Sequence, residues 1–162
     1  MAIRSLGIGW GWRGSQHAPD ARVEQQELIR WATGRPKQGG AVPALAAGLA
    51  DADPCVRRMA ARLLGRMRTP ESTRALLDAL SSPDPATRRL GAIGLGYAED
   101  RTTVDPLLQA LDDGDAGVRA TAAWALGEVE DPRALPALTR LLARDPDPDV
   151  RRAAAVAIGD LY

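Results

Sequence analysis

Residues 115–127 read Asp-Ala-Gly-Val-Arg-Ala-Thr-Ala-Ala-Trp-Ala-Leu-Gly, and three other stretches of the chain share this pattern. Its central Arg119 has counterparts at Arg57, Arg88 and Arg151, and the four arginines follow one another at intervals of 31, 31 and 32 residues. An aspartate precedes each arginine by four residues, and a glycine follows it by eight. Self-similarity at such a period indicates a fold made of stacked units.

Each copy of the pattern predicts a hairpin of two helices. The aspartate is a good N-cap for the longer helix, because its carboxylate accepts hydrogen bonds from the free amides of the first turn. Apolar residues at positions −1, +3 and +7 from the arginine form one stripe of that helix. The glycine at +8 either ends the helix or lets a neighbouring helix approach closely. A shorter helix precedes it, beginning after a turn such as Thr69-Pro70 and burying a leucine pair such as Leu107 and Leu111.

The composition agrees with stacked hairpins and excludes several classes of protein. Hydrophobic residues make up 45% of the 162 residues, but only 4% are aromatic and 30 are alanine, so the core must consist of small and medium side chains. The 21 basic residues are balanced by 21 acidic ones, which excludes a wholly basic nucleic-acid binder. Residues 1–74 carry a net charge of +6 and residues 75–162 a net charge of −6. One cysteine and one histidine exclude a disulfide framework and most histidine-built metal sites.

The repeat register divides the chain. We expect an irregular Gly/Trp-rich segment over residues 1–19 and a degenerate N-terminal capping repeat over 20–41. The four repeats themselves are predicted over residues 42–162, with these bounds: 42–68, 69–99, 100–130 and 131–162. Because two short helices cannot cover each other's apolar faces, the repeats must share a continuous core.

The repeats resemble the short HEAT-like repeats of the phycobilisome-lyase type, whose pattern is D-x-x-V-R-x-x-A-x-x-A-L-G. Residues 115–127 match every fixed position, whereas residues 84–96 depart most, with Thr for Val and Gly for both Ala. We expect this second repeat to be the loosest or most bent, because glycine weakens a helix interior. The resemblance implies an all-α, right-handed α-solenoid of about four to five HEAT-like hairpins with a 31-residue period. It also implies that the repeated arginines pair with acidic residues at repeat junctions.

A second stripe of each longer helix varies from copy to copy. Positions +1, +5 and +9 from the arginine share one face, and in such solenoids these helices line the concave side. Arg, Trp and Tyr at these positions are residue types enriched in binding hot spots. The alternative interpretation is a solvated helix face. The predicted partner-binding residues are Arg58, Arg62, Arg66, Arg89, Ile93, Tyr97, Trp124, Glu128 and Arg152.

These features predict a non-catalytic scaffold that binds a protein or peptide partner, one that could carry acidic groups, on the concave face. We expect a cytoplasmic protein without a cofactor, a metal, a membrane partner or a nucleic-acid partner, and self-association through the C-terminal repeat stays open. Two other functions compete with this hypothesis. One is a bilin-lyase-like accessory or chromophore-handling protein, and the other is a nucleic-acid-binding HEAT-like module.

Overall fold

The computed structural model of the protein describes residues 40–162, which belong to one compact unit, Gln38–Tyr162. The segment predicted to be irregular and nearly all of the predicted capping repeat lie outside the described residues. Between residues 40 and 162 the chain forms helices and no strand. The elements are α2 (Ala41–Gly48), α3 (Pro54–Met67), α4 (Pro70–Leu80), α5 (Pro85–Ala98), the 3-10 turn η1 (Arg101–Thr103), α6 (Val104–Ala110), α7 (Ala116–Val129), the 3-10 turn η2 (Pro132–Ala134), α8 (Leu135–Arg144) and α9 (Pro148–Asp160).

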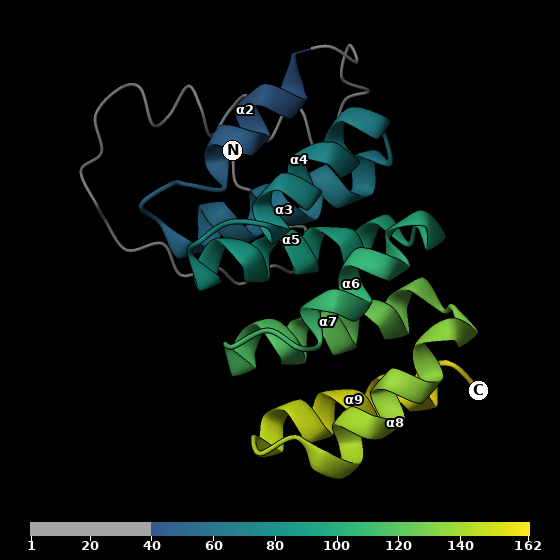
Figure 1. Cartoon of the computed structure of the whole chain (residues 1–162). Coiled ribbons are helices and arrows are strands. Elements are labelled where there is room, and N and C mark those ends of the chain that lie inside the picture. The colour runs from purple at the N-terminus through teal and green to yellow at the C-terminus, as the bar shows by residue number, and fades with distance from the viewer. Residues whose placement is uncertain (1–39) are drawn as a thin grey trace, which may run out of the picture. The chain divides into compact units, whose positions relative to one another are not determined.

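The helices alternate between two rows, as Figure 1 shows. The longer helices α3, α5, α7 and α9 pack one against the next, and each also packs against the shorter helix that precedes it in the chain. This is the all-α solenoid of helical hairpins that the repeat predicted. No helix of the described region is long and apolar enough to cross a membrane.

The predicted N-caps begin the longer helices. The side chains of Asp53, Asp84, Asp115 and Asp147 each accept a hydrogen bond from a backbone amide in the first turn. Proline follows three of them at the first helical position, where a missing N–H costs nothing. The shorter helices begin at the predicted turns as well, with a reciprocal capping box between Thr69 and the residue three positions later in α4.

Leucines from both rows form the core. Leu64, Leu95 and Leu126 in the longer helices are fully buried, as are Leu76, Leu107 and Leu138 in the shorter helices. Burial of one leucine side chain stabilises a fold by about 1.5–3 kcal/mol. The shared seam between the rows therefore supplies the main driving force for stacking.

The glycine eight residues after each arginine lies inside its helix rather than at its end. The helices continue beyond it and stop at Arg68, Glu99 and Glu130, which adopt the left-handed conformation with φ near +50°. A Cβ atom on Gly96 would lie 2.7 Å from the Trp124 ring. The helix-ending interpretation is therefore wrong at Gly65, Gly96 and Gly127, and the close-approach interpretation is confirmed there.

The glycines of α5 mark close packing, in contrast to the loose repeat that we expected. A Cβ atom on Gly91 would lie 2.8 Å from the carbonyl oxygen of Leu76 in α4. On the other side, a Cβ on Gly94 would lie 2.9 Å from the carbonyl oxygen of Ala61 in α3. Both glycines are buried. Their lower helix propensity is offset by the approach of two neighbouring backbones.

Candidate partner-binding groove

A groove of about 690 Å³ runs along the row of longer helices. It begins on α3, crosses α5 and α7, and ends at the N-terminus of α9. Six of the nine residues predicted from the varying stripe line it. The full lining is Arg58, Arg62, Arg89, Ile93, Tyr97, Ala116, Gly117, Ala120, Thr121, Trp124, Asp147 and Asp149.

Two aromatic rings form the centre of the groove. The rings of Tyr97 and Trp124 meet edge to face, with their centroids 5.4 Å apart and their planes at 63°. The guanidinium of Arg62 lies 4.9 Å from the centroid of the Tyr97 ring, and that of Arg66 lies 5.7 Å from it. Trp124 also packs against Gly96, where the missing side chain leaves room for the indole. Contacts on several sides thus fix both rings in place.

The charges of the groove are separated along its length. Arg58 and Arg62 lie on α3, and Arg89 extends from α5 to Gly117 in the first turn of α7. Asp147 and Asp149 lie at the N-terminus of α9. Guanidinium groups bind carboxylates or phosphates, and carboxylates attract cationic side chains. The groove is therefore suited to an extended ligand with an acidic end, an apolar centre and a basic end.

Three of the predicted residues do not line the groove. Arg66 is exposed and approaches the site only through the Tyr97 ring. Glu128 is exposed on the last turn of α7. Arg152 pairs with Asp149 at 2.9 Å between their side chains, and both are largely exposed. Asp147 and Asp149 were missed as groove residues because the sequence pattern explained Asp147 as an N-cap and did not include Asp149 in the varying stripe. Asp147 does cap α9, so its recurrence before the helix was already accounted for and gave no further indication of a groove role.

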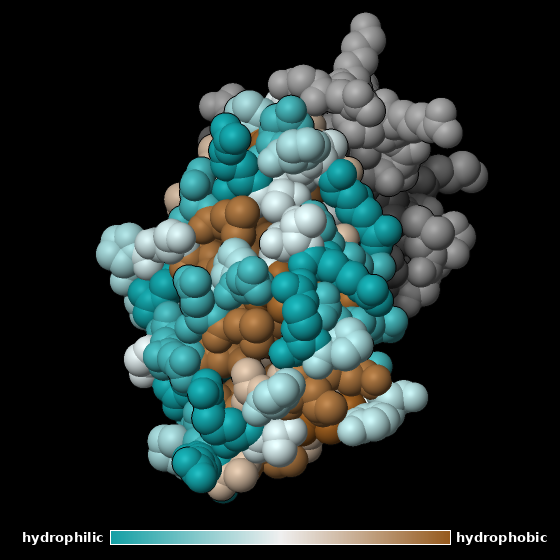
Figure 2. All heavy atoms as spheres, turned by 45° about the vertical axis from the view of Figure 1, so that its right-hand side comes forward, coloured by the Kyte–Doolittle hydropathy of each residue, from teal (hydrophilic) through white to brown (hydrophobic). Residues whose placement is uncertain are grey.

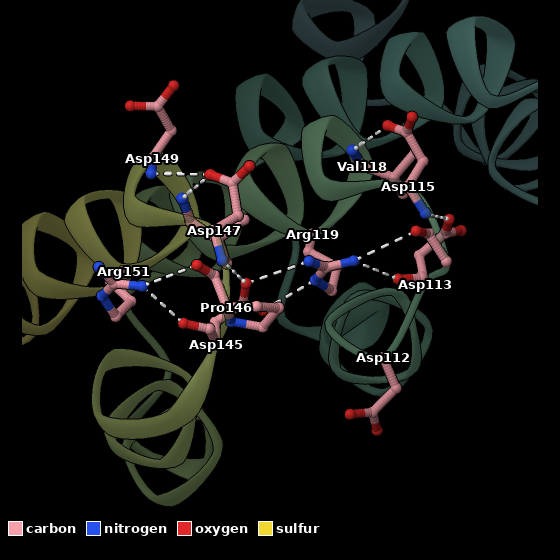
Figure 3. Close-up of polar contacts among 12 residues, drawn as sticks. Asp112, Asp113, Asp115, Val118, Arg119, Asp145, Pro146, Asp147, Asp149 and Arg151 are labelled. Carbon is pink, nitrogen blue, oxygen red and sulfur yellow. Dashed lines mark hydrogen bonds and ion pairs between the residues drawn. The ribbon is translucent and has the colours of Figure 1, made fainter.

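The repeated arginines hold the repeats together. Arg88 donates to Asp113 of the next repeat through Nε and Nη2, at 2.7 and 2.8 Å. Arg119 donates in the same way to Asp145, at 2.8 and 3.0 Å. The Nη1 group of Arg119 also donates to the carbonyl oxygens of Asp113 and Gly114 in its own turn, and Figure 3 shows the pairing with both turns.

These pairs are largely shielded from solvent and shift the acidity of the aspartates. The hydrogen bonds from Arg88 hold the pKa of Asp113 below its ordinary value, and those from Arg119 do the same for the pKa of Asp145. The junction role implied by the resemblance is confirmed for both arginines. Arg57 and Arg151 differ, since their guanidinium groups donate only to carbonyl oxygens of their own turns within the described chain.

A model of HEAT repeats matches residues 14–81 and 73–159, which together cover most of the sequence. This chain belongs to the HEAT-repeat family. No curated protein sequence gives a significant match to it. In residues 40–162, no group of three His, Cys, Asp or Glu side chains is placed to hold a metal ion.

Several solved structures share the HEAT-type fold. The complex of CpcE and CpcF of phycocyanin lyase from Nostoc sp. PCC7120 matches with a TM-score of 0.63 and 26% identity, over 98% of this chain and 70% of that chain. Human deoxyhypusine hydroxylase in complex with glycerol matches with a TM-score of 0.61 and 25% identity, over 88% of this chain. This chain spans only 55% of the hydroxylase. An engineered protein with 24% identity and a TM-score of 0.51, over 74% of this chain and 62% of its own, is similar in fold.

Proposed function

We propose that this HEAT-repeat protein is a non-catalytic scaffold and that its groove binds a segment of a partner protein. The observation that carries the proposal is the contrast between repeat positions that hold the same residue in most repeats and repeat positions whose residue varies. Leu64, Leu95 and Leu126 are the same residue in three repeats and are fully buried. The stripe beside them differs at positions +5 and +9 in all four repeats, and this stripe supplies seven of the groove residues.

The groove binds by presenting side chains that are already held in place. Trp124 and Tyr97 provide an apolar surface whose orientation is fixed by mutual contact and by Arg62. A partner segment that covers these rings loses little free energy to ordering of the site. Acidic groups of the segment pair with Arg58 and Arg89, which are exposed in the free protein.

Removal of groove arginines tests this proposal. Arg58→Ala combined with Arg89→Ala removes two exposed groove cations and should weaken binding of a captured partner about tenfold or more. Arg74→Ala combined with Arg144→Ala is the matched control, because it removes two exposed cations outside the groove. Calorimetric titration of each variant with the purified partner gives the comparison. Equal affinities for both double variants would show that the groove is not the binding site.

Chromophore handling is a second candidate, and similarity to the phycocyanin lyase complex supports it. A lyase-like accessory would place the tetrapyrrole over the Tyr97 and Trp124 rings, with its propionates on the arginines. Co-expression with a bilin pathway followed by visible spectroscopy of the purified protein distinguishes the two functions. Absorbance that Trp124→Leu removes would favour chromophore handling over peptide binding.

A cytoplasmic location and self-association through the C-terminal repeat remain part of the proposal. The described helices contain no candidate membrane span. Light scattering at increasing protein concentration measures self-association.

A further inference from the structure

Helix α3 carries positive charge that no acidic side chain among residues 40–162 balances. The helix contains four arginines and no acidic residue. Three of these arginines, Arg58, Arg62 and Arg66, follow one another at intervals of four residues and form the α3 arginine stripe on one face of the helix. None of the three forms an ion pair within the described region, whereas two of the repeated arginines pair with aspartates. Like charges at this spacing repel one another, so a bound anion would relieve the repulsion.

Tyr97 of α5 holds part of this stripe in place. The guanidinium carbon of Arg62 lies 4.9 Å from the centroid of the Tyr97 ring, and that of Arg66 lies 5.7 Å from the same centroid. The ring attracts both cations but leaves their charge intact. Because Trp124 packs against the same ring, the two guanidinium groups lie beside the apolar centre of the groove.

The α9 end of the groove offers carboxylate oxygens. Oδ1 of Asp147 accepts the amides of Asp149 and Val150, at 2.8 and 3.3 Å (Figure 3). Its Oδ2 accepts no hydrogen bond from residues 40–162. Asp149 pairs with Arg152 at 2.9 Å, but both side chains are largely exposed, so solvent weakens this pair. A cation of a bound segment therefore has access to both carboxylates.

Three steps between neighbouring helices separate the two charged ends. Helix α3 packs against α5, α5 against α7, and α7 against α9. Packed helix axes lie about 8–10 Å apart, so the three steps span about 24–30 Å. An extended chain advances about 3.3 Å per residue, so about seven to nine residues cover this span. One short extended segment can thus reach both ends.

Hydrophobic surface alone does not single out this region. Figure 2 shows one face of the molecule, on which hydrophobic patches lie among hydrophilic side chains, as is ordinary for a folded protein. What distinguishes the groove is that two fixed aromatic rings lie between unpaired cations on α3 and carboxylates at the start of α9.

We propose that the groove selects its partner segment by the separation of opposite charges along that segment, an inference that rests on the function proposed above. One end of the segment carries at least two acidic residues, because a single carboxylate pairs with only one guanidinium in bidentate fashion. A basic residue follows or precedes them by about seven to nine positions and pairs with Asp147 or Asp149. An apolar side chain between the two ends packs on Trp124. The α3 arginine stripe and Asp149 are thus the specificity-determining groups.

Two synthetic peptides of identical composition test the charge separation. The segregated peptide has two glutamates at one end, one tryptophan at the centre and two arginines at the other end, with a Gly/Ser spacer that places the charges about eight positions apart. The mixed peptide has the same residues, with each glutamate next to an arginine. Both are blocked at their termini, labelled with a dye and titrated with the full chain, with fluorescence anisotropy as the readout.

The segregated peptide should bind at least tenfold more tightly than the mixed peptide, and high salt should reduce this preference because it screens exposed charges. Equal affinities for the two peptides, or no saturable binding of the segregated peptide, would overturn the proposed selection.

Charge exchange in the protein assigns each end. Arg58→Glu combined with Arg62→Glu should weaken binding of the segregated peptide at least tenfold and should favour a peptide with arginines at both ends. Such a gain cannot come from a variant that has lost its fold. Arg74→Glu combined with Arg144→Glu is the matched control, because it changes the net charge equally at exposed positions outside the groove. Equal weakening by both double variants would overturn the assignment of the acidic end to α3.

Asp149→Arg makes the corresponding test at the other end. This variant should prefer a peptide with glutamates at both ends over the segregated peptide, and an unchanged preference would overturn the assignment of the basic end to α9.

Failure of this inference is distinguishable from failure of the proposed function. If Arg58→Ala with Arg89→Ala weakens binding of the captured partner but the segregated and mixed peptides bind equally, the groove binds a segment without selecting its charge pattern. If the captured partner binds that double variant and its control equally, the groove is not the binding site and both proposals are wrong.

Discussion

The first and third described junctions join equivalent helices by different means. At the third, between α7 and α9, Arg119 and Asp145 form a bidentate pair, and a Cβ atom on Gly127 would lie 3.0 Å from the Cα atom of Ala157. At the first, between α3 and α5, the acidic position is occupied by Ser82, and within residues 40–162 Arg57 donates only to the carbonyl oxygens of its own turn.

Close backbone packing takes the place of the missing ion pair at the first junction. Gly65 faces Gly94, and a Cβ atom on Gly65 would overlap the carbonyl oxygen of Gly94. Ser82 keeps the other role of the acidic position, because its Oγ accepts a hydrogen bond from the Asp84 amide at 3.2 Å, as Asp145 does from the Asp147 amide at 2.9 Å. The comparison shows that small residues are required for stacking, whereas the ion pair is an addition that one junction lacks.

The largest effect is expected for Gly65→Ala at the first junction. Alanine is the better helix former by about 1 kcal/mol, but its Cβ would lie 2.9 Å from the Cβ of Tyr97 as well as overlapping the α5 backbone. Such overpacking should lower the free energy of unfolding by about 1–3 kcal/mol. Gly159→Ala is the control, because Gly159 holds the same repeat position as Gly65. Its surroundings are open, so the free energy of unfolding should rise by about 0.5–1 kcal/mol. Urea denaturation measures both, and a gain for Gly65→Ala would contradict the packing argument.

Acid should weaken the third junction before the first. Because the folded pKa values of Asp113 and Asp145 are lowered, the unfolded chain takes up protons first as the pH falls. The stabilisation is fully present above the unfolded pKa of about 3.9 and is lost as the pH falls from there through the lower folded values. Hydrogen exchange measured at descending pH should show α9 losing protection ahead of α3. Asp145→Asn should remove this difference, and an identical acid response in both helices would argue against the pairing.

The smallest effect is expected when the missing carboxylate is restored. Ser82→Asp places an acid next to the free edge of Arg57 and should raise the free energy of unfolding by about 0.5–1 kcal/mol. Ser82→Asn serves as the matched variant, since it has the same size and can accept the Asp84 amide but carries no charge. Thermal melts at low and high salt compare the two. A gain that is equal for both variants would assign it to the turn rather than to an ion pair.

Much of the fold was predictable because helix starts depend on local chemistry. The capping aspartates and the prolines after them act within a few residues, so spacing alone located the starts of α3, α5 and α9. The role of glycine at +8 was not decided by sequence, because close approach and helix ending favour the same residue. Helix ends were less visible still, since Arg68, Glu99 and Glu130 adopt positive φ without being glycine.

The groove was predictable only where one helix supplies the signal. The i, i+4 spacing of Arg58 and Arg62, and of Arg89 and Ile93, placed these side chains on one face. Asp147 and Asp149 reach the groove from the N-cap and the first turn of α9, so their participation depends on how repeats stack. Glu128 lies one turn too far along α7 to line the groove, although its register position is correct. Helix periodicity predicts which face of a helix a residue lies on, but it does not predict how far along the helices a groove between them extends.

A double-mutant cycle on Arg119 and Asp145 tests most directly the claim that paired side chains and small residues join the repeats independently. Arg119→Ala, Asp145→Ala and the double variant are compared with the parent chain by urea denaturation, and the same cycle is made for Arg57 and Ser82. The account predicts a coupling energy of about 1.5–3 kcal/mol at the third junction and less than about 0.5 kcal/mol at the first. Additive effects at Arg119 and Asp145, or an equal coupling at both junctions, would contradict it.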